Sequence, residues 1–250
     1  VILINPPLTM EEQAGNSSME VVTNILPPLG IGYIASVLEA NGIDVEILDC
    51  QPLNMDFKDL GKDLKNKNSD VIGITATTLS LPNAVKTAFV IREFSPKSYI
   101  VIGGPHITAA PETTMANECF DAGVYGEGEE TCLELIQKIR DNQGINNVKG
   151  LYLRRDGKPY FTGHRPYIKE IDKLPFPTRH LFPSLSLYHP TPASCRSEPL
   201  ATIMSSRGCP NKCTFCDRKI FGNTTRLRSI DNVLDEMEEV INKHGAKEIK

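Results

Sequence analysis

The sequence lacks several features that would place it in a class of protein at once. No apolar run approaches the length that spans a bilayer, and no secretory leader stands at the start, so we expect a cytoplasmic protein. Dense runs of basic residues are also absent, and the net charge of -4 argues against nucleic acid as a partner. These absences favour chemistry on a small-molecule substrate.

An initiator methionine is missing as well. The chain opens inside an apolar run at Val1 and stops at Lys250, where a further strand is expected to begin. Its 250 residues are long for one compact domain and suit one domain with part of another. We therefore expect a fragment of a longer protein.

Short runs rich in valine and isoleucine predict strands that are buried on both faces of a sheet. They cover residues 1–5, 45–49, 71–75, 99–104 and 122–126. Segments of helical period alternate with them, among them residues 29–42, 81–94 and 130–141. This alternation predicts an α/β domain with a doubly wound parallel sheet over residues 1–145. The ligand of such a sheet lies beyond the carboxyl ends of the strands.

The loops at those ends contain the candidate binding residues. Glycine lets the backbone approach a bulky ligand, and threonine hydroxyls both donate and accept hydrogen bonds. The same residues also serve tight turns, but several such loops at one edge favour a site. The candidates are Thr75, Thr77, Thr78, Gly103, Gly104, Pro105, His106, Gly126, Glu127 and Gly128.

Two readings of this edge are disfavoured. A dinucleotide needs a glycine fingerprint after the first strand, and Asn5, Pro6 and Pro7 stand there instead. His106 could be a metal ligand or a proton donor, but a lone histidine in a loop is more often a hydrogen-bonding surface group.

Residues 146–198 predict a hairpin followed by a proline-rich connector. Asp156 and Gly157 form a turn signal between two strand-like runs, so the hairpin is expected to cap the first domain. Arginine and histidine side chains of the connector are expected to tether it to a neighbouring surface. These residues are Arg165, Arg179, His180 and His189.

Residues 199–250 predict the start of a second domain. A strand over residues 201–206 is followed by a cysteine loop, a helix from Ser229 to about His244 and a further strand. An apolar stripe runs along this helix, and the acidic residues 235–239 are expected to stay solvated on its other side. This order predicts the opening of a barrel of parallel strands.

The cysteine loop contains Cys209, Cys213 and Cys216 at a C-x3-C-x2-C spacing. The seven cysteines of the chain fit a reducing compartment better than a disulfide framework. Structural zinc takes four ligands, usually as two short pairs, and no second pair lies nearby in the sequence. Three thiolates suit an iron–sulfur cluster with one iron open to a substrate. A three-cysteine core and a zinc site completed by histidine are the alternatives.

At this point the sequence resembles a known family. The stretch RGCPNKCTFC is similar to the signature of the radical S-adenosylmethionine (radical SAM) enzymes, whereas VIGITATT, IVIGGPH and VYGEGEET resemble a cobalamin-binding domain. The connector RPYIKEIDKLPFPTRHLFP and the post-cluster stretch FGNTTRLRSIDNVLDEMEEV resemble the cobalamin-dependent radical enzymes too. The resemblance thus covers essentially the whole chain.

The resemblance implies a Rossmann-like, flavodoxin-like cobalamin domain before a partial radical SAM (β/α) barrel. It makes the three loop cysteines the ligands of a [4Fe-4S] cluster, with S-adenosylmethionine (SAM) at the fourth iron and Phe215 against its adenine. The ten candidate residues above would line the cobalamin site. The D-x-H-x-x-G motif, by which one class of cobalamin proteins supplies a histidine to cobalt, is missing after the first strand, so we predict that no side chain from that loop binds cobalt.

The implied activity is reductive cleavage of SAM to a 5'-deoxyadenosyl radical, with an electron donor such as flavodoxin or ferredoxin. Methyl transfer to an unactivated carbon is the main expectation, and cyclisation or rearrangement with cobalamin is an alternative. A methylthiotransferase acting on RNA is another, and it would need a second cluster on Cys50, Cys119 and Cys132. A non-enzymatic cobalamin-binding module is the third. We expect the fragment alone to be inactive.

Overall fold

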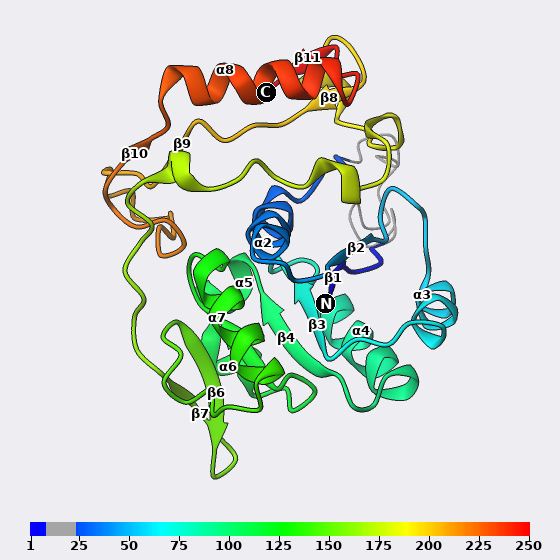
Figure 1. Cartoon of the computed structure of the whole chain (residues 1–250), viewed down its shortest axis with the longest axis vertical. Helices are drawn as coiled ribbons and strands as arrows, with labels where there is room; N and C mark the ends of the chain where they lie inside the picture. The colour runs from blue at the N-terminus through cyan, green and yellow to red at the C-terminus, as the bar shows by residue number, and fades with distance from the viewer. Residues whose placement is uncertain (9–23) are drawn as a thin grey trace.

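The computed structural model describes residues 1–8 and 24–250. A large sheet with helices on both faces forms one part of the molecule (Figure 1). A smaller unit of one helix and short strands lies above the sheet in the figure. Helix α2 (Leu29–Ala40) lies between the sheet and this unit. Within the described ranges, no helix is long and apolar enough to cross a membrane.

The large sheet has seven strands in the order β2-β1-β3-β4-β5-β6-β7. The first strands in the chain are β1 (Ile2–Asn5), β2 (Glu46–Asp49), β3 (Val71–Thr75), β4 (Tyr99–Gly103) and β5 (Ala122–Val124). They pair in parallel throughout. Because β1 lies between β2 and β3, the direction of winding reverses there, and ligands of such sheets bind at this kind of switch point. The predicted doubly wound α/β fold is confirmed.

Helices cover both faces of this sheet. They are α2 (Leu29–Ala40), α3 (Phe57–Lys65), α4 (Leu81–Phe94), α5 (Pro105–Ala109), α6 (Pro111–Met115) and α7 (Glu129–Arg140). Successive strand residues point to opposite faces, so Ile4 packs with α3 and α4 whereas Leu3 packs with α2 and α7. Short α5 and α6 were not predicted. Each begins at a proline, which suits the first turn of a helix.

The predicted hairpin is confirmed, but it belongs to the large sheet. Its strands are β6 (Leu151–Arg155) and β7 (Lys158–Phe161), joined by Asp156 and Gly157 with positive φ angles. Strand β6 pairs antiparallel with β5, which extends the sheet to Phe161. The sheet therefore runs beyond the predicted range of residues 1–145, because the hairpin covers the edge of β5. The division at residues 145 and 198 stays a prediction.

The connector packs between the sheet and the smaller unit. It contains the short 3-10 turns η1 (Ile171–Lys173), η2 (Arg179–Leu181), η3 (Leu185–Leu187) and η4 (Pro192–Ser194). Phe182 joins the core beneath α2, and Tyr188 joins a separate small core with Val240. Buried apolar side chains at positions 182 and 188 thus hold this part of the connector in place.

The smaller unit contains β8 (Leu200–Ala201), β9 (Ser206–Arg207), β10 (Arg226–Leu227), α8 (Ile230–Asn242) and β11 (Glu248–Ile249). Strands β8 and β11 pair in parallel around α8, as predicted for the opening of a barrel. The single strand predicted over residues 201–206 is wrong, because it is interrupted between β8 and β9. There the carbonyls of Thr202 and Met204 accept hydrogen bonds from arginine side chains.

Helix α8 corrects the expectation that all of residues 235–239 stay solvated. Glu236 is completely buried, and its carboxylate binds Arg228 and, at 2.6 Å, Nη2 of Arg179. Much of the predicted apolar stripe is exposed instead, with Ile230 79% accessible. Ser229 is the N-cap, as predicted, and its hydroxyl accepts from the Asn232 N–H. The ion pairs of Glu236 with Arg179 and Arg228 determine which side of α8 faces inward.

Replacing Glu236 with Gln should lower the free energy of unfolding by about 3 kcal/mol, since two buried guanidinium groups lose their counter-charge. Urea denaturation measures this change. The matched control is Glu238→Gln, an exposed position, which should stay within about 0.5 kcal/mol of the original chain. Equal, small effects of the two substitutions would contradict a structural role for the buried carboxylate.

Candidate functional site

The loops after β3 and β4 form one compact ledge at the carboxyl edge of the sheet. The Ala76 N–H donates to the Gly103 carbonyl, and the His106 N–H donates to the Ala76 carbonyl, both at 3.0 Å. Thr77 and Thr78 are exposed on this ledge, and the Thr78 hydroxyl lies 3.1 Å from Nδ1 of His106. The surface of the ledge therefore contains the hydroxyl groups of Thr77 and Thr78 and the imidazole of His106, next to the backbone of two glycines.

Gly104 is required by the geometry of the ledge. Its φ of 96° lies in the region that favours glycine, and an added Cβ would lie 2.8 Å from the Thr75 hydroxyl. The neighbouring Gly103 differs, because a Cβ there would meet only the Ile74 carbonyl, at 4.0 Å. The backbone at Gly103 is thus open to a ligand. A bulky, amide-bearing ligand such as a corrin fits such a surface of open backbone and hydroxyls.

The loop after β5 is engaged with the protein itself. The Glu127 side chain is only 5% exposed, and its carboxylate binds Arg207 and Arg226. A Cβ on Gly128 would lie 2.9 Å from Cδ1 of Ile34, so this glycine lets α2 approach. The carboxylate of Glu127 is occupied by protein donors, and contacts of this loop with cobalamin stay predictions.

The cysteine loop runs between β9 and β10. Cys209 is half-buried, whereas Cys213 and Cys216 are exposed, and all three are free thiols. Phe215 is also exposed, with 92% of its surface accessible. Within residues 1–8 and 24–250, no three histidine, cysteine or acidic side chains converge as a metal site. The chemistry of three soft thiol donors on one exposed loop fits an iron–sulfur cluster, and binding it requires the thiols to converge.

A buried carboxylate near the switch point was missed by sequence reasoning. Asp49 is fully buried at the end of β2 and accepts from Nδ2 of Asn5 and the hydroxyl of Tyr188, both at 2.8 Å. Burial raises the pKa of Asp49 to about 6, although the hydrogen bonds from Asn5 and Tyr188 oppose this shift. The sequence signal that could have revealed this site is that Asn5 and Asp49 are polar residues at the ends of two apolar strands.

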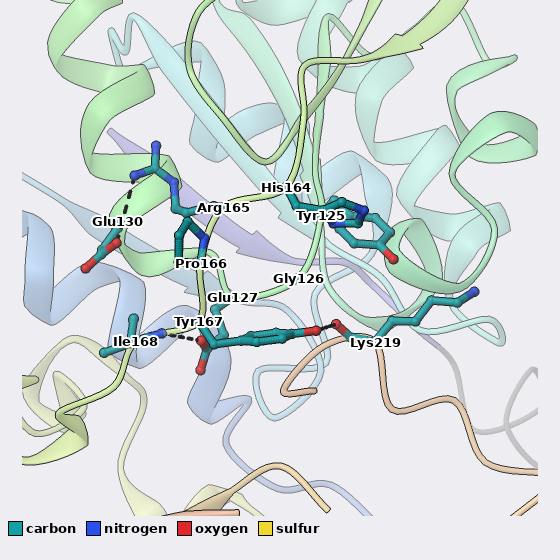
Figure 2. A pocket seen from close by; sticks show the side chains of 10 residues that line it. All are labelled: Tyr125, Gly126, Glu127, Glu130, His164, Arg165, Pro166, Tyr167, Ile168 and Lys219. Carbon is teal, nitrogen blue, oxygen red and sulfur yellow. Dashed lines mark hydrogen bonds and ion pairs between the residues drawn. The ribbon is translucent and has the colours of Figure 1, made fainter. Parts of the chain in front are cut away.

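A cavity of about 280 Å³ lies where the loop after β5, the connector and the cysteine loop meet. Tyr125 and Gly126 line it from the sheet, His164 and Tyr167 from the connector and Lys219 from the cysteine loop. Figure 2 shows Tyr167 reaching across to the main chain of Lys219, whose carbonyl accepts its hydroxyl at 2.9 Å. The cysteine loop therefore stands directly beside the sheet edge.

The sequence of this chain is similar to those of known proteins. Residues 17–136 match the family model of the B12 binding domain. The chain is 33% identical over 252 residues to the uncharacterized methyltransferase PH0819 of Pyrococcus horikoshii, covering 100% of this chain and 52% of that protein. It is 28% identical to cytidylyl-2-hydroxyethylphosphonate methyltransferase of Streptomyces wedmorensis, covering 99% of this chain and 53% of that protein. The chain thus spans about half the length of these curated relatives.

Solved structures share the fold. The cobalamin-dependent SAM radical enzyme OxsB, with aqua-cobalamin and SAM bound, gives a TM-score of 0.76 at 20% identity, covering 96% of this chain and 31% of that one. The radical SAM methyltransferase TsrM of Kitasatospora setae, with cobalamin and a [4Fe-4S] cluster bound, gives 0.69 at 20% identity, covering 96% and 45%. Both the sheet and the smaller unit are therefore found together elsewhere.

The Asp49 carboxyl should make stability depend on pH. Its folded pKa of about 6 lies above the ordinary 3.8, so the favoured neutral form stabilises the fold at low pH. Stability should fall by about 3 kcal/mol as pH rises from about 3 to about 7, and Asp49→Asn should remove this decline. Denaturant titrations across this range measure it. The exposed control Asp44→Asn should keep the decline, and an unchanged slope in Asp49→Asn would contradict the assignment.

Gly104→Ala should lower the free energy of unfolding by about 3 kcal/mol, since it adds both a positive φ and a steric clash. Gly157→Ala is the matched control, because its φ is 74° but no atom lies within 4 Å of an added Cβ. That control should cost about 1 kcal/mol. Thermal unfolding compares them, and equal losses would show that the ledge is not closely packed.

Proposed function

This chain belongs to the cobalamin-binding-domain radical SAM family, and from this we propose that it is part of a methyltransferase. The ledge after β3 and β4 binds cobalamin, and the cysteine loop binds a [4Fe-4S] cluster with SAM. When bound, the cluster and SAM supply radical chemistry and cobalamin supplies a methyl group. The acceptor is an unactivated carbon of a small molecule.

One observation carries the proposal: the cysteine loop stands on the sheet edge that bears the ledge. An added Cβ on Gly126 would lie 3.8 Å from the carbonyl of Ile220 and 4.0 Å from that of Lys219. Two groups bound to such neighbouring segments would share one reaction space. This juxtaposition is what transfer of a methyl group between cofactors and substrate requires.

The residues of the chain have separate tasks in this proposal. Cys209, Cys213 and Cys216 provide thiolates to iron. The exposed hydroxyls of Thr77 and Thr78 bind amide groups of the corrin, and Gly103 admits its bulk. Phe215, whose ring is exposed, is available to contact the adenine of SAM. The whole arrangement orients the cofactors, and the reaction itself is theirs.

Methyl transfer is favoured over the alternatives by the relatives. They include hopanoid C-3 methylase of Methylococcus capsulatus and the cobalamin-dependent radical SAM methyltransferase TokK of Streptomyces tokunonensis. An anaerobic magnesium-protoporphyrin IX monomethyl ester cyclase of Rubrivivax gelatinosus, 29% identical, represents the cyclase alternative. TsrM has been solved with a tryptophan substrate, which supports a small-molecule acceptor.

The methylthiotransferase alternative loses support from three buried cysteines. Cys50 and Cys119 lie in the core on one face of the sheet, whereas Cys132 lies in the core on the other. They cannot converge on one cluster without unfolding the sheet. Burial also raises the pKa of Cys50 and that of Cys132 to about 12, which opposes the thiolate form that binds iron. The electron donor, flavodoxin or ferredoxin, stays a prediction.

Cofactor content tests the proposal. The chain, expressed anaerobically with cobalamin, should contain about four irons and one corrin. Cys213→Ala should lose the iron and keep the corrin, because the two groups bind to different segments. The control Cys195→Ala, outside the loop, should keep both.

Other contents would contradict the proposal in distinct ways. Zinc without iron would exclude a radical SAM cluster, and about eight irons without corrin would favour the methylthiotransferase alternative. Loss of corrin together with iron in Cys213→Ala would contradict separate sites on the ledge and the loop.

A further inference from the structure

Two arginines close the base of the cysteine loop. Arg207 in β9 and Arg226 in β10 face each other as partners in the antiparallel pair, and the three cysteines lie between them in the sequence. Their side chains are 1% and 11% exposed. A group that fixes these two guanidinium groups therefore fixes both ends of the loop.

Both arginines bind the carboxylate of Glu127. Nη1 of Arg207 donates to Oε1 at 3.0 Å, and Nη1 of Arg226 lies 3.0 Å from Oε1 and 2.9 Å from Oε2. The Ile168 N–H also donates to Oε2, at 2.9 Å (Figure 2). One carboxylate from the sheet edge thus joins the entrance of the loop, its exit and the connector.

Further contacts hold the guanidinium groups in one orientation. Nη2 of Arg207 donates to Glu129 at 2.6 Å, so two carboxylates balance two arginines in this buried cluster. The guanidinium carbon of Arg207 lies 4.9 Å from the ring centre of Tyr33 and 5.2 Å from that of Phe221. Rings above the guanidinium plane and carboxylates at its edge leave it little freedom.

Close backbone packing accompanies these contacts. Gly208 directly follows Arg207, and an added Cβ there would clash with the Thr224 carbonyl. A Cβ on Gly222 would lie 2.5 Å from the ring of Tyr167, itself 5.2 Å from the guanidinium carbon of Arg226. The two ends of the cysteine loop are therefore packed against each other, and its exit is packed against Tyr167 of the connector.

We propose that Glu127 is a positioning residue, whose carboxylate seats the cysteine loop on the sheet edge and so sets the loop's place relative to the ledge. Its side chain then serves the loop instead of contacting cobalamin. The inference rests on the proposed function only in that the loop binds an iron–sulfur cluster. The seating itself holds for the chain without any cofactor.

Hydrogen exchange in Glu127→Gln tests the seating in the cofactor-free chain. The reporter is residues 208–222, where the Cys209 N–H donates to the Gly222 carbonyl and the Gly222 N–H to the Arg218 carbonyl. Amides of this segment should exchange about ten-fold faster, because two buried arginines lose the charge that holds them.

The matched control is Glu236→Gln, which also removes a buried carboxylate bound by two arginines. It should accelerate exchange in α8 and leave residues 208–222 unchanged. Equal acceleration of this segment in both variants, or in neither, would overturn the inference. A wild-type chain without iron and corrin would instead refute the proposed function, and the exchange result would still decide on the seating.

Spectroscopy of the reconstituted chain separates positioning from stability. The electron paramagnetic resonance spectrum of the reduced cluster should change in Glu127→Gln and stay unchanged in Glu236→Gln, with equal corrin content in both. Loss of corrin in Glu127→Gln with an unchanged cluster spectrum would overturn the proposal, because Glu127 would then be a cobalamin contact.

Discussion

The buried contact of Glu127 with Arg207 and Arg226 joins the sheet edge to the cysteine loop, and the arrangement of both candidate sites depends on it. Burying charges is costly, so such a cluster adds little net stability compared with apolar packing. It is demanding in geometry, however, because each donor and acceptor must meet its partner. An interaction of this kind fixes where a segment lies more than how firmly the chain folds.

A second cluster of the same design holds the smaller unit. Glu236 of α8 lies between Arg179 of the connector and Arg228 near β10. Tyr33 of α2 lies close to both clusters, since Arg207, Arg228 and Glu236 all influence its pKa, which burial raises to about 12. The connector and the cysteine loop are thus anchored separately, by two carboxylates from different elements.

Much of this fold could be predicted from the sequence, but the two clusters could not. Apolar runs predicted β1 to β5, the parallel strands of the large sheet, within a residue or two, because burial on both faces requires continuous valine and isoleucine. Charge patterning failed for Glu236, since it treats acidic residues as solvated, whereas Glu127 was assigned to the cobalamin site from its place in a glycine loop. Arg207 and Glu127 are 80 residues apart, so no local pattern reveals their pairing.

The candidate site was predicted unevenly for the same reason. The spacing of Cys209, Cys213 and Cys216 is local, and it identified the thiol loop directly. The glycines had two possible uses: Gly104 shapes the ledge, whereas Gly128 admits the side chain of Ile34. Only tertiary contacts separate these uses. Asp49 was missed because its partner Tyr188 comes from the distant connector.

The central claim is that corrin and cluster bind side by side on this chain, on the ledge and on the seated cysteine loop. Magnetic coupling between the two tests it most directly. In the reconstituted chain, the paramagnetic resonance signal of cob(II)alamin should broaden or split when the cluster is reduced. A cobalt signal that is identical with oxidised and reduced cluster would contradict the account.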